Sequence, residues 1–240
     1  MTRRVSLPMA MTVREAISIA GTLGHPSKMP GFSYGISALQ CKRGGEMRKI
    51  PGSVCASCYA MTKWYRTWVP LLAGHARRFA GLQHPRWCDA MVRMIDAKCS
   101  TPATAWFRWH DSGDLQGVWH LANIVQVAAR TPTVRHWLPT REYAIVDEFL
   151  AQGGRIPSNL VVRLSAEMID AEPDIVRRFP RLAGLPTSTV QTAAASSLGL
   201  VLGERKGWIE CRAVEARDNK CGPCRACWAP EVANVSYPQH

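Results

Sequence analysis

The stretch AWFRWHDSGD, residues 105–114, decides the fold, because it has the pattern of a strand that ends in a polar turn. Side chains alternate across a strand, so Phe107 and Trp109 are expected on one side and Arg108 and His110 on the other. We expect the aromatic pair to face a layer of helices and the polar pair to face an interior. A polar interior of this kind indicates a ligand chamber; polar residues at solvated strand ends are the alternative.

Strand-like and helix-like runs alternate on both sides of this stretch. Further strands are expected at 32–40, 133–140, 159–166 and 187–192, with a sixth near 198–203 or 207–211. Helices are expected at 59–66, 71–81, 88–98, 119–130, 142–154 and 171–180. This alternation is typical of βαβ units around a parallel sheet. It predicts an α/β fold, a partial TIM-like (βα)6 barrel over 1–205, with a cysteine-rich C-terminal extension over 206–240 packed on the barrel.

Ligands of such sheets lie beyond the carboxyl ends of the strands. Those ends read CKRGG (41–45), HDSGD (110–114), PTRE (139–142) and LSAE (164–167), and all four are polar. Candidates for substrate contact or proton handling therefore come from these ends. They are Arg108, His110, Asp111, Arg141 and Glu142.

The chain carries a net charge of +12, from 30 basic and 18 acidic residues among 240. Between Cys41 and Arg78 stand eight basic residues and one acid, Glu46. Such a concentration predicts a polyanionic partner, a nucleic acid or a nucleotide; a solvated basic face is the alternative. No apolar run approaches the roughly 20 residues that a membrane span requires, and no signal peptide is evident. We expect a cytoplasmic protein without a membrane partner, in the host cytoplasm if the chain is phage-encoded.

Cysteines spaced in this way are more often metal ligands than disulfides in a reducing compartment. Seven of the nine form two groups. The first group is Cys41, Cys55 and Cys58, and the second is Cys211, Cys221, Cys224 and Cys227. Cys88 and Cys99 stand apart on a predicted helix, where we expect them to be small apolar fillers.

Three thiolates are one short of a closed tetrahedral zinc site, for which His75 is a candidate fourth ligand. A 4Fe–4S cluster held by three cysteines instead keeps one iron open to a further ligand. The second group contains the C-x2-C-x2-C run typical of ferredoxins. We therefore favour one or two 4Fe–4S clusters. Zinc is the alternative, with Cys55 and Cys58 paired with Cys221 and Cys224 as two knuckles.

Several motifs carry a resemblance to known proteins. PGSVCASCYA (51–60), RWHDSGDLQ (108–116) and CGPCRACW (221–228) resemble the mycobacteriophage "gene product 88" family, from about residue 30 to the end of the chain. More distantly, CASCYA and the strand ends that follow it resemble phage proteins grouped with the radical S-adenosylmethionine (SAM) superfamily. Those enzymes are partial (βα)6 barrels whose open iron binds SAM, which an external electron donor helps to cleave to a 5′-deoxyadenosyl radical.

The distant resemblance implies roles for particular residues. Cys41, Cys55 and Cys58 would hold the SAM-binding cluster, and the second cysteine group would hold an auxiliary cluster. The remaining cofactor-binding residues would be Ser112, Gly113 and Asp114 at the SAM amino group, and Ser165 and Glu167 at the ribose. The superfamily spacing is C-x3-C-x2-C, whereas thirteen residues separate Cys41 from Cys55 here.

These expectations combine into an iron–sulfur, radical-SAM-like enzyme that acts on a nucleic acid, a nucleotide or another anionic substrate, such as phage DNA. Two alternatives share the cysteines. One is a zinc-stabilised, non-catalytic nucleic-acid-binding protein. The other is an iron–sulfur redox or Lewis-acid protein that does not use SAM.

Overall fold

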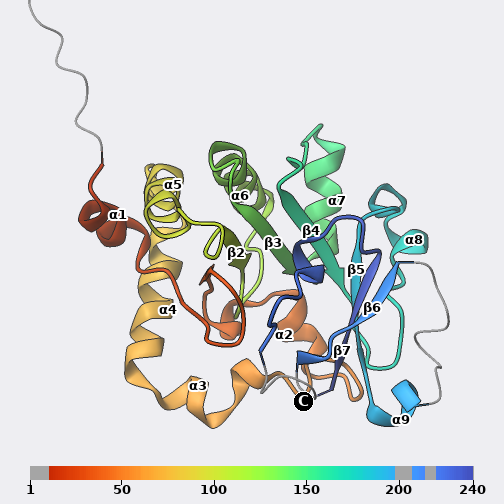
Figure 1. The fold of residues 1–240 in the computed structure, drawn as a ribbon. Helices are drawn as coiled ribbons and strands as arrows, with labels where there is room; N and C mark the ends of the chain where they lie inside the picture. Colours follow the sequence, from red (N-terminus) through yellow and green to blue (C-terminus); the bar gives the residue numbers. More distant parts are fainter. Residues whose placement is uncertain (1–10, 198–206, 214–219, 240) are drawn as a thin grey trace, which may run out of the picture.

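Seven parallel strands form one open sheet in the computed structural model, which describes residues 11–197, 207–213 and 220–239 (Figure 1). Their order across the sheet is β1 (Phe32–Tyr34), β2 (Trp106–Trp109), β3 (Arg135–Thr140), β4 (Leu160–Ser165), β5 (Thr187–Gln191), β7 (Asn234–Pro238) and β6 (Trp208–Glu210). The first five therefore lie side by side in chain order. The predicted α/β fold with a parallel sheet is confirmed, and β1 and β6 are its edges among the described residues.

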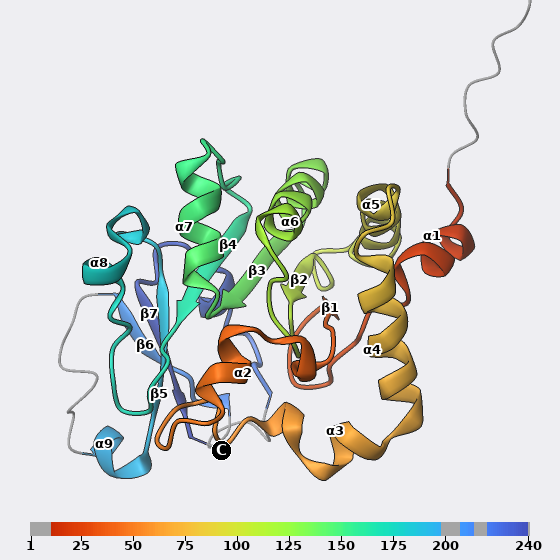
Figure 2. The same cartoon turned by 180° about the vertical axis from the view of Figure 1, so that it is seen from behind.

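Helices cover one face of this sheet (Figures 1 and 2). The described α-helices are α1 (Val13–Ala20), α2 (Arg43–Met47), α3 (Lys63–Thr67), α4 (Val69–Gly81), α5 (Trp87–Lys98), α6 (Val118–Arg130), α7 (Tyr143–Ala151), α8 (Ile175–Arg178) and α9 (Ala193–Ser197). Short 3-10 turns are η1 (Ala38–Gln40), η2 (Tyr59–Met61), η3 (Pro180–Leu182) and η4 (Ala226–Trp228). None of the described helices has the length and apolar character needed to cross a membrane.

The main apolar core lies between the sheet and helices α5 to α7, and α1 and α8 also contribute buried residues to it. Phe107 and Trp109 of β2 are fully buried there, as the alternation predicted, and Trp87 of α5 packs 6.0 Å from Trp109 between ring centroids. Full burial of each large apolar side chain contributes about 1.5–3 kcal/mol. This layer fixes the strands in place, so the loops at their carboxyl ends are held in a defined arrangement.

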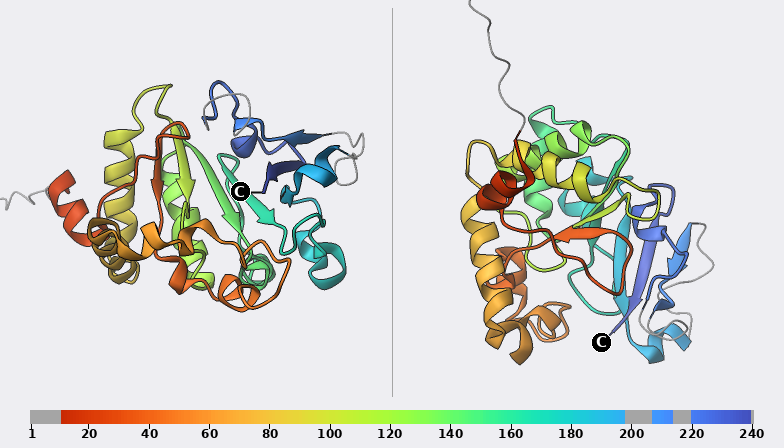
Figure 3. Two further views of the ribbon diagram at one scale, coloured as in Figure 1. Left: turned by 90° about the horizontal axis from the view of Figure 1, so that it is seen from below. Right: turned by 60° about the vertical axis from the view of Figure 1, so that its left-hand side comes forward.

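The C-terminal extension packs on the other face of the sheet. Trp228 of η4 lies between Trp106 of β2 and Trp137 of β3, with ring centroids 5.7 and 5.2 Å away, and its indole N–H donates to the Phe107 carbonyl at 2.9 Å. Figure 3 shows the extension and the helices on opposite sides of the curved sheet. Because β6 and β7 also come from this extension, it both covers one face and completes the sheet.

Arg163 of β4 holds the extension against the sheet. Its side chain is fully buried and donates hydrogen bonds to four carbonyls at 2.8–3.1 Å. These carbonyls belong to Thr187, Ala226, Ala229 and Val232. This part of the polar inner face is therefore occupied by the chain itself rather than by a ligand chamber.

The position of His110 differs from the prediction. β2 ends at Trp109, and His110 adopts a φ of +55°, which interrupts the alternation of side chains. Its ring packs against His120 of α6, with centroids 5.2 Å apart. The expectation that His110 lies on the same side as Arg108 is therefore wrong, because alternation holds only while the backbone stays extended.

Other differences concern element bounds. The helix expected at 59–66 begins as the turn η2, and the one expected at 171–180 is only α8, since Pro173 and Pro180 bracket it. The sixth strand is β6, within 207–211; the other choice, 198–203, lies outside the described residues. Neither α1 nor β7 was expected.

Candidate metal centre and active site

The loops that follow β1 to β4 meet at the carboxyl edge of the sheet. The loop after β1 carries the first cysteine group and α2, and Figure 2 shows α2 beneath the strand ends. An isolated antiparallel bridge joins Ser53 of this loop to Met168, just beyond β4. The carboxyl edge is thus where the cysteines and the polar strand ends come together, as the sequence predicted.

Cys41 and Cys55 of the first group lie beside Gly44 of α2, and the Cys58 thiol is close enough to affect the pKa of both. A methyl group added at Gly44 would lie 3.1 Å from the Cys41 Cβ, 3.5 Å from the Cys55 Sγ and 3.6 Å from the Cys41 Sγ. Burial raises the pKa of the Cys41 thiol, and the nearby Asp114 carboxyl and the Cys58 and Cys55 thiols raise it further. A residue without a side chain at 44 therefore leaves space beside these sulfur atoms.

The long spacing between Cys41 and Cys55 has a structural explanation. The intervening residues form α2 and a turn, rather than an open loop. The Ser53 hydroxyl donates to the Met47 carbonyl at 2.6 Å, and the Val54 N–H donates to the Glu167 carbonyl at 2.9 Å. The insertion therefore brings Cys55 back beside Cys41 while contacting the end of β4.

Asp114 is held at the centre of the edge. Its carboxylate accepts hydrogen bonds from the Leu115 N–H at 2.8 Å, the Thr140 hydroxyl at 2.6 Å and the Arg141 N–H at 2.9 Å. It is 7% exposed, and burial raises its pKa although these three donors lower it. An ionised carboxylate has about four acceptor positions, so one stays open for a further donor.

The turn before Asp114 requires its glycine. Gly113 has a φ of +81°, and a Cβ there would lie 2.4 Å from the Ile36 side chain. The neighbouring Ser112 is buried, and its hydroxyl has no hydrogen-bond partner among the described residues. Such a buried, unpartnered hydroxyl is uncommon and is available to a ligand.

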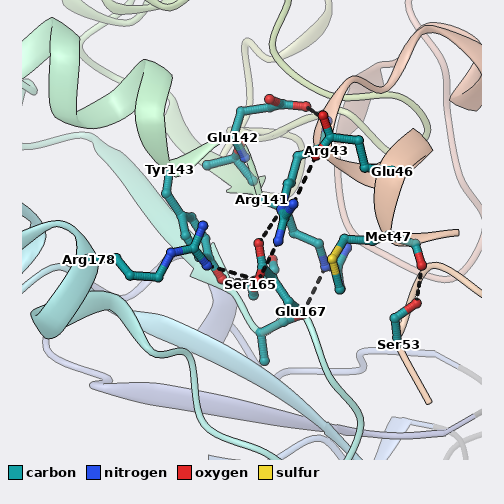
Figure 4. Close-up of polar contacts among 12 residues, drawn as sticks. Arg43, Glu46, Met47, Ser53, Arg141, Glu142, Tyr143, Ser165, Glu167 and Arg178 are labelled. Carbon is teal, nitrogen blue, oxygen red and sulfur yellow. Dashed lines mark hydrogen bonds and ion pairs between the residues drawn. The ribbon is translucent and has the colours of Figure 1, made fainter. Parts of the chain in front are cut away.

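A network of charged residues joins the cysteine loop to β3 and β4 (Figure 4). Arg43 of α2 makes a two-pronged contact with Glu167, at 2.6 and 3.0 Å, and Arg178 reaches the same carboxylate at 3.1 Å. The Glu142 carboxylate accepts from the Arg43 N–H at 2.8 Å. Burial and the neighbouring Asp114 raise the pKa of Glu142 to about 7, so it can exchange a proton near neutral pH.

Arg141 and Ser165 complete the edge. The Arg141 side chain donates to the Ala166 carbonyl at 2.9 Å, and its positive charge opposes the rise that burial causes in the pKa of Cys55. Ser165 ends β4; its hydroxyl accepts from Ser188 at 3.1 Å and its carbonyl from the Tyr143 hydroxyl. All the residues predicted at the ends of β3 and β4 therefore lie within one network.

Arg108 lies between the two cysteine groups. Its guanidinium stacks on Trp137 at 4.6 Å. Burial lowers the pKa of Arg108, but Tyr59 and Asp111 on one side and Tyr237 and Cys227 on the other raise it, and the net direction is upward. Tyr59, which follows Cys58, also donates to the Asp111 carbonyl. Arg108, which is half-buried, therefore lies within electrostatic reach of Tyr59, next to the first group, and of Cys227 in the second.

The second group gathers where the extension meets β6 and β7. Cys211 follows β6 and its N–H donates to the Ser236 carbonyl at 2.7 Å, while the Cys221 N–H donates to the Lys28 carbonyl at 2.9 Å. Burial raises the pKa of Cys221, and the Cys211 and Cys224 thiols add to the rise. Burial also raises the pKa of Cys227 to about 11. The four thiols are therefore neighbours, although residues 214–219 between them lie outside the described part.

The two remaining cysteines and His75 lie elsewhere. Cys99 is buried in the apolar core and Cys88 packs against it, in agreement with their expected role as fillers. His75 of α4 lies near Arg78 and Asp111, and burial lowers its pKa.

Both cysteine groups offer thiol sulfur, the donor that zinc and the irons of a cluster both accept. Among the described residues, no three His, Cys, Asp or Glu side chains converge as the ligands of one metal ion. A zinc ion draws its thiolates to about 2.3 Å from one point, whereas a cubane places each thiolate on a different iron. Cys41 and Cys55, which both lie beside Gly44, supply donors of this kind.

The fold and the edge define an α/β protein with a parallel sheet and two cysteine groups, one in the loop after its first strand. Within that class, the chain belongs to the phage Gene product 88 family, whose family model matches residues 14–230. The predicted resemblance to this family is confirmed. No curated protein and no solved structure matches the chain.

Sequence reasoning missed several residues of the site. Arg43, Thr140 and Arg178 hold the predicted carboxylates in place. Thr140 and Arg43 stand within the quoted strand ends, so their position was a usable signal. Arg178 lies on the short helix α8 and gave no such signal.

Proposed function

We propose that this protein is an iron–sulfur enzyme of the radical-SAM-like kind, with a substrate-facing cluster and an auxiliary cluster. The observation that carries the proposal is the meeting of Cys41, Cys55 and Cys58 with the polar ends of β2 to β4 at one edge. The chain order of β1 to β5 supports the finer description of the sheet as a partial TIM-like barrel.

The two groups would have different roles because their ligand counts differ. Three thiolates leave one iron of a cubane open, so the first group would hold the cluster that meets a small molecule. Four thiolates close a cubane, so Cys211, Cys221, Cys224 and Cys227 would hold the auxiliary cluster. When bound, a reduced cluster and SAM supply one-electron chemistry that the side chains alone lack. An electron-donating partner would be required.

The chain's own residues would bind and orient the small molecule. Ser112 offers a hydroxyl that has no partner among the described residues, Gly113 lets the turn pack tightly against Ile36, and Asp114 has one acceptor position left for an ammonium group. A hydrogen bond between charged groups there is of the stronger kind. Ser165 and Glu167 would bind hydroxyl groups of a ribose at the end of β4.

Proton handling would fall to Glu142. Its raised pKa, about 7, lets it accept or release a proton near neutral pH, and Arg43 keeps it next to the cysteine loop. Arg108, Asp111 and Arg141 are the further candidates for substrate contact. His110 is the weakest candidate, since its ring packs in the helix layer. The basic segment from Lys42 to Arg78 supports a nucleic acid or another anionic substrate.

Paired cysteine variants test this division of roles. Cys58→Ser should leave a folded protein that retains the auxiliary cluster but neither binds SAM nor releases 5′-deoxyadenosine. Cys224→Ser should lower stability, because metal bound by four chain ligands contributes to folding. Electron paramagnetic resonance of the reduced protein with and without SAM provides the readout. If both variants lose the same amount of iron and SAM does not change the wild-type spectrum, the two cysteine groups do not have these different roles.

A further inference from the structure

A hollow of about 300 Å³ opens between the end of α4 and the start of α6. It is lined by Phe79, Ala80, Leu82, Gln83, Gln116 and Trp119. A second hollow, of about 410 Å³, shares Leu82, Gln83 and Trp119 with it. Trp119 therefore stands between two adjoining hollows. None of the residues that line either hollow belongs to the proposed cofactor site.

Two aromatic rings are left exposed in this hollow. Phe79 is 37% exposed and Trp119 38%. Trp119 stacks on His120 with ring centroids 5.4 Å apart, and a Cβ at Gly117 would lie 2.8 Å from the indole nitrogen. The indole ring is therefore fixed in orientation rather than free to fold away. Fixed, exposed aromatic rings are the groups on which proteins stack unpaired bases.

Two carboxamides supply polar groups beside these rings. The Gln116 amide nitrogen donates to the Gln40 carbonyl at 3.0 Å and to the Asp114 carbonyl at 2.8 Å. These two bonds fix the orientation of the Gln116 amide. They also link the hollow to Gln40, the residue before Cys41. Gln83 is exposed on the opposite wall. Both amide hydrogens of Gln116 are used in these two bonds, so Gln116 presents its amide oxygen as an acceptor, while Gln83 offers both a donor and an acceptor to the edge of a base.

The charge around the hollow suits phosphate groups. No aspartate or glutamate occurs between Glu46 and Asp89, and Asp89 is paired with Arg130 at 2.8 Å. Arg77 is exposed on α4, two residues before Phe79. A cationic surface interleaved with exposed aromatic rings is typical of proteins that bind single strands.

We propose that the hollow between α4 and α6 binds an unpaired base of a single-stranded nucleic acid. The inference rests on the proposed function, which already calls for an anionic substrate. It adds that this substrate is a single-stranded nucleic acid. A duplex keeps its bases stacked on one another, so their faces are not available to Phe79 and Trp119. The strand would continue across Gln116 toward the cysteine edge, where the chemistry is proposed to occur.

Binding of a fluorescein-labelled oligothymidylate to the anaerobically purified protein, followed by anisotropy, tests this inference. The single strand should bind more tightly than a blunt duplex of equal length. Phe79→Ala and Trp119→Ala should each weaken binding by about 5- to 150-fold, the effect of losing one stacked base. Ile17→Ala, at an equally exposed helical position on α1, is the matched control and should change nothing.

Gln83→Glu provides a second variant that alters only an exposed side chain, and its negative charge should also weaken binding. Equal affinity for duplex and single strand, or unchanged binding by all three variants, would overturn the inference. A protein that contains iron but binds no oligonucleotide would overturn it while leaving the proposed cluster chemistry intact. Single-strand binding by a protein without iron would refute the proposed function instead.

Discussion

Removing the anchor of the C-terminal extension should cost about 3 kcal/mol in the free energy of unfolding. Arg163→Met keeps the length of the side chain but deletes four hydrogen bonds of 2.8–3.1 Å to carbonyls of β5 and the extension. Bonds from a charged donor contribute about 1.5–3 kcal/mol each, a gross sum of about 6–12 kcal/mol. Against this stands the penalty of burying a guanidinium, several kcal/mol, which the variant no longer incurs.

Burial lowers the pKa of Arg163, which shows that this penalty is only partly offset in the folded protein. The difference between the two contributions leaves about 3 kcal/mol, near the lower end of measured costs for breaking a buried charged network. At a urea slope of about 3 kcal/mol per molar, the midpoint should fall by about 1 M.

Urea unfolding followed by tryptophan fluorescence measures this change, since Trp228 and Trp137 lie at the anchored interface. Arg135→Met, on an exposed position of β3, is the control and should shift the midpoint little. Limited proteolysis should also cut the variant first within the extension. A change below about 0.5 kcal/mol, equal to that of the control, would refute the anchoring role.

Three further predictions concern Gly44, two buried histidines and Arg108. Gly44→Ala should lower the iron content per chain, measured after anaerobic purification, because its methyl group fills the space beside the Cys41 and Cys55 sulfur atoms; unchanged iron would contradict the location of the cluster. Burial lowers the pKa of His120 and His136 to about 3 in the folded protein. In the unfolded chain a histidine has a pKa of about 6.5, so only the unfolded state takes up protons as the pH falls through that value. Stability should therefore fall by about 1.4 kcal/mol per histidine between pH 7.5 and 5.5, and His136→Asn should show a shallower fall in chemical denaturation. Arg108→Met should make the clusters harder to reduce, by some tens of millivolts in a redox titration, since it removes a half-buried positive charge near Tyr59 and Cys227. An unchanged potential would place Arg108 away from the clusters.

The sequence predicted the sheet well because parallel strands and amphipathic helices leave strong local patterns. β2 to β5 and α4 to α7 lie close to their expected positions, and the polar strand ends meet as expected. β7 was missed because it follows a cysteine-rich loop, and its pairing between β5 and β6 is with strands chosen by the tertiary fold. The local sequence pattern does not predict which strands, far apart in the chain, will pair.

The errors at the site have similar causes. His110 was assigned to the inner face by alternation, but a single residue with positive φ turns its ring toward α6. A polar interior was read as a ligand chamber, whereas Arg163, one of its polar residues, binds the chain's own extension. Residue type indicated polarity at these positions, and only the tertiary arrangement shows which partner satisfies it.

Iron and acid-labile sulfide in anaerobically purified protein test the central claim most directly. The account predicts a brown protein with about eight irons and eight sulfides per chain, two cubanes' worth. Roughly half of that should remain in Cys58→Ser. A colourless protein with stoichiometric zinc and no sulfide would contradict the account and would favour a zinc-stabilised binding protein instead.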